Sequence, residues 1–253
     1  MLLELRGLTK QFGGLTAVSY FDMHVEEGEI VGLIGPNGAG KSTVFNLITG
    51  VFKPTAGRVS YNEEDITGKK PHEVAALGIG RTFQLNPLFA DFTVLENVSA
   101  SFHLRPRSGL LATYFNTRTY RKNEAYIRGA SLDILKVVGL EQAKDELAKN
   151  LPHGYQKMLG VARALATRPK LLLLDEPLGG MNPSEIDFTL NSIRKTRSQG
   201  ATFLIVEHNM QILDLCERVV VINFGQKICE GSPKEVREDK QVIRAYFGGE
   251  HAA

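Results

Sequence analysis

The sequence has few of the features that mark special classes of protein. It contains two cysteines among 253 residues, which excludes a disulfide framework, and neither is spaced from a histidine as in a zinc site. We expect Cys216 and Cys229 to be small core residues. No apolar run comes near the roughly 18 residues that a membrane-spanning helix needs. Glu4 and Arg6 interrupt the apolar start of the chain, so we expect no secretory signal.

The net charge is also small. Thirty lysines and arginines face 28 aspartates and glutamates, so the formal charge of +2 gives no strong case for nucleic-acid binding. Apolar residues make up 43% and charged residues 23%, as in ordinary globular proteins, which disfavours disorder and coiled coil. Glycine is the one excess, at 25 residues. These bounds predict a soluble, cytoplasmic protein of one large or two small domains.

The apolar pattern alternates between strands and helices. Segments typical of strands are 3–6, 19–25, 30–34, 57–61, 171–174, 203–206 and 219–222. Ile186, Leu190 and Ile193 lie between two of them at helical spacing. Strand–helix alternation predicts an α/β fold with a mostly parallel sheet. Residues 86–150 lack strand-like runs and predict an inserted helical subdomain.

Two segments carry signals for the start of a helix. In Asn182-Pro183-Ser184-Glu185, Asn can cap, Pro suits the first helical position and Glu lies three residues after the cap. Ser232-Pro233-Lys234-Glu235 repeats this signal and predicts one C-terminal helix that ends near Gly248.

A glycine-rich loop with a lysine follows the apolar run at 30–34. It fits the pattern G-x-x-x-x-G-K-[ST] with Gly35, Pro36, Asn37, Gly38, Ala39, Gly40, Lys41 and Ser42, followed by Thr43. Such glycines let successive N–H groups point at one anion, and the next helix directs its positive end at the same place. Lys41 can neutralise phosphate oxygens, and Ser42 can hold Mg²⁺. The loop therefore predicts a nucleotide site.

A pair of acids follows the apolar run at 171–174. Ligands of α/β sheets bind at the carboxyl ends of parallel strands, where Asp175 and Glu176 are expected. Asp175 can hold the metal, and Glu176 can polarise an attacking water. The pair therefore indicates hydrolysis as well as binding.

These segments, taken in order, resemble the ATP-binding subunit of an ABC transporter. Gly35 to Ser42 resembles the Walker A motif, and Leu171 to Glu176 resembles Walker B. The remaining matches are Arg81-Thr82-Phe83-Gln84 (Q-loop), Leu151-Pro152-His153-Gly154-Tyr155-Gln156 (signature), Gly180-Met181-Asn182 (D-loop), Val206-Glu207-His208-Asn209 (H-loop) and Phe12, at the place of an aromatic that stacks on adenine.

The resemblance implies a role for each matched residue. Phe12 would bind the base, the loop from Gly35 to Thr43 would bind phosphates, and Gly154 would contact the nucleotide of a partner cassette. The metal would be held by Ser42, Gln84 and Asp175. The catalytic residues would be Glu176, which polarises water, Lys41, and the γ-phosphate sensors Gln84 and His208.

The signature departs from the usual L-S-G-G-Q. Pro152, His153 and Tyr155 replace the serine, the first glycine and the glutamine, and Asn182 replaces the D-loop aspartate. Proline has neither the hydroxyl nor an N–H to offer a phosphate, so we expect a weaker site. Several segments resemble the branched-chain amino-acid uptake branch of the family, namely 4–10, 12–14, 46–50, 93–98 and 242–248.

The resemblance also implies fold, function and partners. A P-loop NTPase (RecA-like) core with an antiparallel β subdomain would occupy 1–85 and 160–253, with the helical subdomain and its signature at 86–159. ATP and Mg²⁺ would be the cofactors, and ATP hydrolysis would power import of branched-chain or related amino acids. Separate permease subunits, a second cassette and, indirectly, an external binding protein would be the partners, at the cytoplasmic face of the inner membrane.

Two alternative functions compete with import. Export ATPases of the lipopolysaccharide type share the appearance of this branch. A non-transport cassette acting on nucleic acid could use a basic stretch, but a single cassette without heptads disfavours it, and no nucleic-acid partner is expected. The stretch, 102–128, also fits a solvated helical face or an anionic membrane surface. It holds Arg105, Arg107, Arg118, Arg121, Lys122 and Arg128 against Glu124, with Tyr114, Tyr120 and Tyr126 interleaved.

Overall fold

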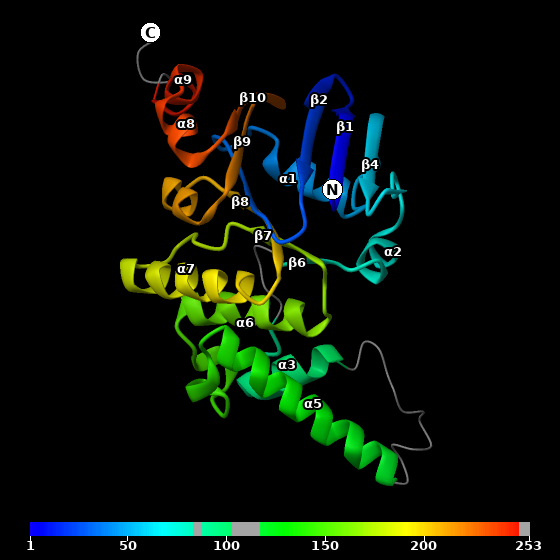
Figure 1. Ribbon diagram of the computed structural model, residues 1–253, viewed down its shortest axis with the longest axis vertical. Helices are drawn as coiled ribbons and strands as arrows, with labels where there is room; N and C mark the ends of the chain where they lie inside the picture. Colours follow the sequence, from blue (N-terminus) through cyan, green and yellow to red (C-terminus); the bar gives the residue numbers. More distant parts are fainter. Residues whose placement is uncertain (83–87, 103–116, 248–253) are drawn as a thin grey trace. The chain divides into compact units, whose positions relative to one another are not determined.

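The computed structural model describes residues 1–82, 88–102 and 117–247, and they form two compact units (Figure 1). One unit, which we call the nucleotide unit, comprises Met1–Arg81, Lys170–Gly179 and the described residues from Gly200 onward. The other, the helical unit, comprises the described residues of Thr82–Pro169 together with Gly180–Gln199. Within the described residues, no helix combines the length and apolar character of a membrane span.

In the part of the helical unit that the structure describes, there are four α-helices. Its elements are α3 (Val94–Phe102), α5 (Arg118–Val137), α6 (His153–Ala166) and α7 (Pro183–Arg197), with short 3-10 turns at Glu141–Ala143 and Ala148–Asn150. Helix α3 packs on α5 and α6, and α7 packs on α6 and α5. The helical subdomain predicted from the sequence, 86–159, lies within the range of this unit. The unit also includes Gly180–Gln199, because α7 packs on α6 and α5.

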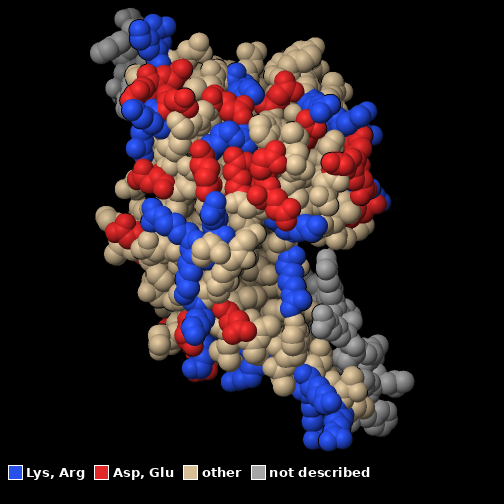
Figure 2. Space-filling model, viewed as in Figure 1, with Lys and Arg blue, Asp and Glu red and all other residues tan. Residues whose placement is uncertain are grey.

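The basic stretch lies partly on α5. Arg118, Arg121, Lys122 and Arg128 are exposed on this helix, and Figure 2 shows basic side chains gathered at its end. Arg105, Arg107 and Tyr114 lie outside the described residues. Within the helical unit, the Arg168 guanidinium donates to the hydroxyl of Tyr126 on α5.

A six-stranded sheet forms the centre of the nucleotide unit, in the order β10-β9-β3-β8-β7-β6. Five of its strands are parallel, and β10 pairs antiparallel with β9 at one edge. The strands are β3 (Ile30–Ile34), β6 (Ile79–Arg81), β7 (Leu171–Asp175), β8 (Thr202–Glu207), β9 (Arg218–Asn223) and β10 (Gln226–Gly231). The mostly parallel sheet predicted from the apolar runs is confirmed.

A second, antiparallel sheet of four strands belongs to the same unit, in the order β2-β1-β4-β5. Its strands are β1 (Leu3–Phe12), β2 (Leu15–Val25), β4 (Ala56–Tyr61) and β5 (Glu64–Asp65). The helices of the unit are α1 (Lys41–Ile48), α2 (Pro71–Ala76), α8 (Pro233–Glu238) and α9 (Lys240–Phe247), with a 3-10 turn at Met210–Leu215.

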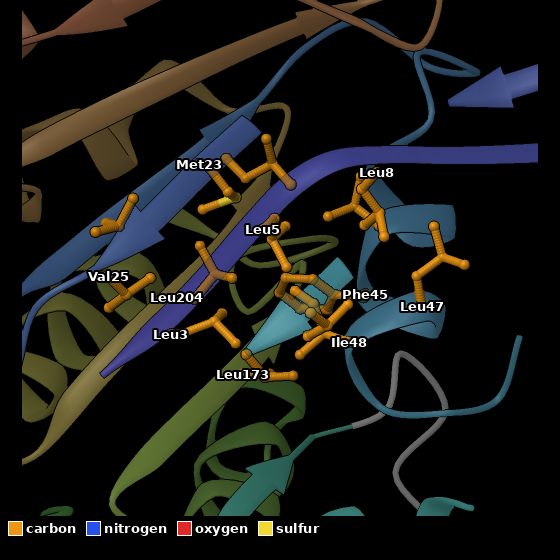
Figure 3. Close-up of a cluster of buried hydrophobic side chains, with 14 of the residues drawn as sticks. Leu3, Leu5, Leu8, Met23, Val25, Phe45, Leu47, Ile48, Leu173 and Leu204 are labelled. Atoms are coloured by element: carbon orange, nitrogen blue, oxygen red, sulfur yellow. The ribbon is translucent and has the colours of Figure 1, made fainter. Parts of the chain in front are cut away.

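One hydrophobic core joins the two sheets and helix α1 (Figure 3). Leu5 of β1, Phe45 of α1 and Leu173 of β7 are among its side chains, and each is at most 1% exposed. Because burial of apolar surface is the main favourable term in folding, this core fixes the start of α1 against the ends of the parallel strands. The loop that precedes α1 is thereby held in place.

The C-terminal helix differs from its prediction. Two helices, α8 and α9, stand where one was expected, because Asp239 between them has extended backbone (φ −69°, ψ 126°). Its carboxylate accepts hydrogen bonds from the N–H groups of Gln241 (2.7 Å) and Val242 (3.0 Å), as a helix cap does. The capping signals at Asn182 and Ser232 are confirmed as capping boxes. Cys216 is buried as expected, whereas Cys229 is only half-buried.

Candidate nucleotide-binding site

The glycine-rich loop lies between β3 and α1. It packs so closely on its neighbours that two of its glycines have no room for a side chain. A Cβ on Gly35 would lie 2.1 Å from the carbonyl oxygen of Ile222, and one on Gly40 would lie 2.7 Å from that of Ala17. Gly40 also has φ 108° where it caps α1, a conformation that favours glycine. The loop is therefore held by β9 and β2 as well as by its own sequence.

Lys41 fills the inside of this loop. Its side chain is buried, and its ammonium donates to the carbonyl oxygens of Gly35 (2.7 Å) and Pro36 (2.9 Å). Burial lowers the pKa of Lys41, while the carboxylates of Glu176, Glu207 and Asp175 act in the opposite direction. The ammonium of Lys41 thus lies near the N-terminus of α1, whose N–H groups also attract anions. This arrangement suits a phosphate group.

A cavity of about 450 Å³ opens over the loop. It brings together the predicted residues Phe12, Glu176 and the loop from Asn37 to Thr43. Phe12 is 41% exposed, and its ring meets Phe52 edge to face at 5.2 Å between centroids. Gly35 and Pro36 of the same loop are not among the lining residues. The sequence did not single out the other lining residues, which are Leu15, Thr16, Ala17, Phe224 and Gly225.

Asp175 ends β7 and is held by an arginine that sequence reasoning left without a role. The Arg81 guanidinium lies 2.8 Å from Asp175 Oδ2, and both side chains are largely buried. Arg81 also donates to the side-chain oxygens of Asn46 (2.7 Å) and Thr49 (3.2 Å) on and beside α1. The carboxylate is therefore fixed in direction beside the loop.

Glu176 follows Asp175 with a strained backbone. Its φ of 48° costs about 1 kcal/mol or more for a non-glycine residue, and such strain concentrates at functional sites. Its N–H donates to the carbonyl oxygen of Val206 (2.9 Å), which holds the turn. His208 Nδ1 lies 3.6 Å from Glu176 Oε1, so these two predicted residues are neighbours.

A buried glutamate supports this pair. Glu207 is 0% exposed, and its carboxylate accepts from the N–H groups of Leu178 (2.7 Å), His208 (3.0 Å) and Asn209 (3.2 Å). It therefore joins the turn after Glu176 to the turn that carries His208. Glu207 belongs to the segment that resembles the H-loop, but its place in the sequence alone predicts no role for it.

Three further predicted residues, Asp175, His208 and Gly154, are not among those that line this cavity. Gln84 lies outside the described residues. Gly154 lies at the start of α6 in the helical unit, where its N–H donates to Glu185 Oε1 at 2.8 Å. Beside it, the Tyr155 ring packs on Phe188 with centroids 4.5 Å apart. Asn182 caps α7 by accepting from the Glu185 N–H at 3.0 Å.

The oxygen donors beside the loop suit Mg²⁺. This ion prefers hard oxygen ligands and is usually bound by one or two carboxylates, with waters and substrate phosphates completing its shell. Ser42 offers a hydroxyl in the cavity lining, and Asp175 offers a fixed carboxylate. Among the described residues, no group of three or more His, Cys, Asp or Glu could form a metal cage. A hydroxyl and a single carboxylate are the kind of protein ligands that Mg²⁺ takes together with substrate phosphates.

A parallel strand, a phosphate loop and a helix define the chain as a P-loop nucleotide-binding protein. The sequence model of the ABC transporter family matches residues 18–179, and a model described as branched-chain amino acid ATP-binding cassette transporter matches 226–252. The chain belongs to the ABC transporter family as an ATP-binding cassette. Members of this family hydrolyse ATP to power transport.

The similarity to individual proteins covers almost the whole chain. The high-affinity branched-chain amino acid transport ATP-binding protein BraF of Pseudomonas aeruginosa is 40% identical over 98% of both chains. A solved ATP-binding cassette of an ABC transporter in its ADP conformation has TM-score 0.84 and 35% identity, covering 98% of each chain. A dimeric bacterial cassette has TM-score 0.76 and 26% identity, covering 92% of this chain and 99% of that one. The fold class expected from the sequence is confirmed.

Proposed function

We propose that this cassette powers import of branched-chain or related amino acids through separate permease subunits. The observation that carries the proposal is the full-length similarity to BraF, a branched-chain amino acid transport protein, together with the match of residues 226–252 to a model of the same class. Both favour import over export of the lipopolysaccharide type and over a role on nucleic acid.

The geometry supports a division of work within the cavity. Phe12 would bind the base, and the N–H groups of the loop and Lys41 would bind the phosphates. Ser42 and Asp175 would hold Mg²⁺, and the resemblance to the family adds Gln84, which lies outside the described residues. When bound, Mg²⁺ neutralises charge on the phosphate oxygens. Arg81 keeps the Asp175 carboxylate in position through the ion pair at 2.8 Å.

Glu176 is the residue we assign to the attacking water. Its carboxylate would accept a hydrogen bond from the water and take its proton as the water oxygen bonds to the γ-phosphorus. The bond from that phosphorus to the β–γ bridging oxygen breaks in the same step, and ADP leaves. His208 Nδ1 lies 3.6 Å from Glu176 Oε1, so the imidazole is a neighbour of this carboxylate. Glu207 fixes the backbone of the turns that carry the two residues. Gln84 and His208 are assigned to contact the γ-phosphate.

The remaining assignments concern other chains. A related cassette is dimeric, and we infer that this chain also pairs with a second cassette, whose nucleotide Gly154 would contact. Permease subunits and an external binding protein would complete the transporter, with the cassette on the cytoplasmic face of the inner membrane. The replaced residues Pro152, His153, Tyr155 and Asn182 would weaken the site that this signature completes.

Glu176→Gln tests the catalytic assignment. The amide keeps the size of the side chain but cannot accept the proton, so we expect ATP binding to persist and hydrolysis to fall by about 100-fold or more in the complex with its permeases. Glu27→Gln, an exposed glutamate of the same unit, is the matched control and should hydrolyse ATP normally. Undiminished hydrolysis by the Glu176 variant would overturn the assignment.

Uptake by the reconstituted transporter tests the substrate class. Proteoliposomes that hold this cassette with its permease subunits should take up leucine, isoleucine or valine when ATP is supplied on the cassette side. Uptake restricted to an unrelated class of solute, or outward movement of lipid, would contradict the proposal.

A further inference from the structure

A two-residue turn joins β9 to β10 and carries a phenylalanine in an unusual conformation. Asn223 pairs with Gln226, so Phe224 and Gly225 form the whole turn, and their φ angles are 45° and 76°. Turns with two positive φ angles are typical of β-hairpins, and they favour Asn-Gly because both residues must adopt left-handed backbone. A bulky aromatic at the first position is an outlier.

Burial does not compensate for this strain. The Phe224 side chain is 85% exposed, so its ring gains little from the hydrophobic effect in the folded chain. A residue that costs energy through its backbone and leaves a large apolar ring in water is not explained by folding. Strained residues of this kind concentrate at sites that bind or react.

The turn is fixed against the phosphate loop. The Gly225 N–H donates to the carbonyl oxygen of Ala39 (2.9 Å), and the Ser19 N–H donates to that of Gly225 (2.9 Å). A Cβ on Gly225 would lie 2.6 Å from the carbonyl oxygen of Ala17, so only glycine fits there. These contacts hold Phe224 where it stands, at the lining of the cavity that also includes Phe12 and the loop.

We propose that Phe224 contacts the nucleotide base, as a second aromatic side chain of the pocket beside Phe12. The inference rests on the proposed nucleotide site and adds a specificity-determining residue to it. The cavity has two kinds of lining, since the N–H groups and Lys41 of the loop suit phosphates, whereas Phe12, Leu15 and Phe224 offer apolar surface. Every nucleobase has a flat face that stacks on an aromatic ring. The part of the ligand that Phe224 recognises is therefore the base.

The strain itself provides the test. Phe224→Asn introduces a residue that tolerates left-handed backbone, so the melting temperature of the full chain should stay the same or rise. Loss of the ring should nevertheless raise the Kd for ATP about tenfold, as measured by calorimetry. Phe224→Tyr, which keeps the ring, should bind ATP within about twofold of the parent, as expected for a stacking contact.

Tyr20 supplies a matched control. It is another exposed aromatic of the same unit with positive φ, at 81% exposure and φ 46°, and it lies outside the lining of the cavity. Tyr20→Asn should change the melting temperature in the same direction as Phe224→Asn, with no change in the Kd for ATP. An equal loss of affinity in both variants would overturn the proposal.

Inorganic tripolyphosphate separates contact with the base from an indirect effect on the loop. Phe224→Asn should leave the Kd of tripolyphosphate unchanged, whereas Lys41→Ala should weaken both tripolyphosphate and ATP. If the Phe224 variant lost affinity equally for both ligands, or for neither, the inference would fail while the site stood. If Lys41→Ala bound both ligands normally, the nucleotide site itself would be misplaced.

Discussion

The two units hold their candidate site residues in different ways. In the nucleotide unit the holding partners come from distant parts of the chain, as in the ion pair of Arg81 with Asp175, 94 residues away. In the helical unit the Gly154 N–H binds Glu185, a residue that also caps its own helix. The difference indicates that the phosphate site depends on the pairing of the parallel strands. The contact at Gly154 joins only the starts of α6 and α7, so we expect its removal to reduce the free energy of unfolding less.

Glu207 should give the largest loss of stability. Replacing it by alanine leaves three N–H groups, those of Leu178, His208 and Asn209, without the carboxylate that accepts from them. Since a buried unsatisfied donor costs about 1–3 kcal/mol, we expect a loss of about 4 kcal/mol in the free energy of unfolding, measured with urea. Glu207→Gln, which keeps one oxygen acceptor, should lose less. Equal stability of the alanine variant and the parent would show that the sheet does not depend on this residue.

Arg81→Met should give the next largest effect. It leaves the Asp175 carboxylate largely buried without its guanidinium partner, and breaking such a pair costs about 3 kcal/mol. Lys149→Met is the matched control in the helical unit, because its pair with Asp91 has a similar distance, 2.7 Å, but is exposed. Exposed pairs often contribute nothing measurable, so that variant should unfold like the parent. Similar losses in both would remove the contrast between the units.

Many features of the fold and of the candidate site could be predicted from the sequence, wherever the residues that form them are close together in the chain. The phosphate loop is contiguous, and the strands β3, β7, β8 and β9 are apolar runs, so both were located before the structure. The capping boxes at Asn182 and Ser232 are four-residue patterns and were equally accessible. In each case the residues that interact are neighbours in the chain.

The features that could not be predicted depend on the pairing of segments that are distant in the chain. The partnership of Arg81 with Asp175 requires β6 to lie beside β7, and that of Glu207 with Leu178 requires β7 beside β8. Phe224 was missed because β10 is exposed or half-buried along its length, so its alternation is weak and the hairpin was not recognised. The break at Asp239 was not predicted, because the sequence pattern indicated one continuous C-terminal helix. In the structure the Asp239 carboxylate caps a second helix, α9.

Glu185 gives the smallest and most specific prediction, through pH. Hydrogen bonds from the N–H groups of Gly154 and then Asn182 lower the pKa of its carboxyl, with a further contribution from His153. A lowered pKa in the folded state adds stability above the ordinary glutamate pKa of about 4.3, and this stability is lost as the pH falls through the lower folded value. Glu185→Gln should therefore lower the melting temperature at pH 7 and leave it nearly unchanged near pH 3.

The exposed Glu235 provides the comparison for that experiment. Its carboxyl pKa is lowered by the N–H and hydroxyl of Ser232 at the start of α8, so it carries the same kind of cap without a second helix. Glu235→Gln should show the same pH profile with a smaller amplitude, because only one helix start is affected. If Glu185→Gln changed the melting temperature equally at pH 7 and pH 3, its contact with Gly154 would be one of packing, and charge would have no part in joining α6 to α7.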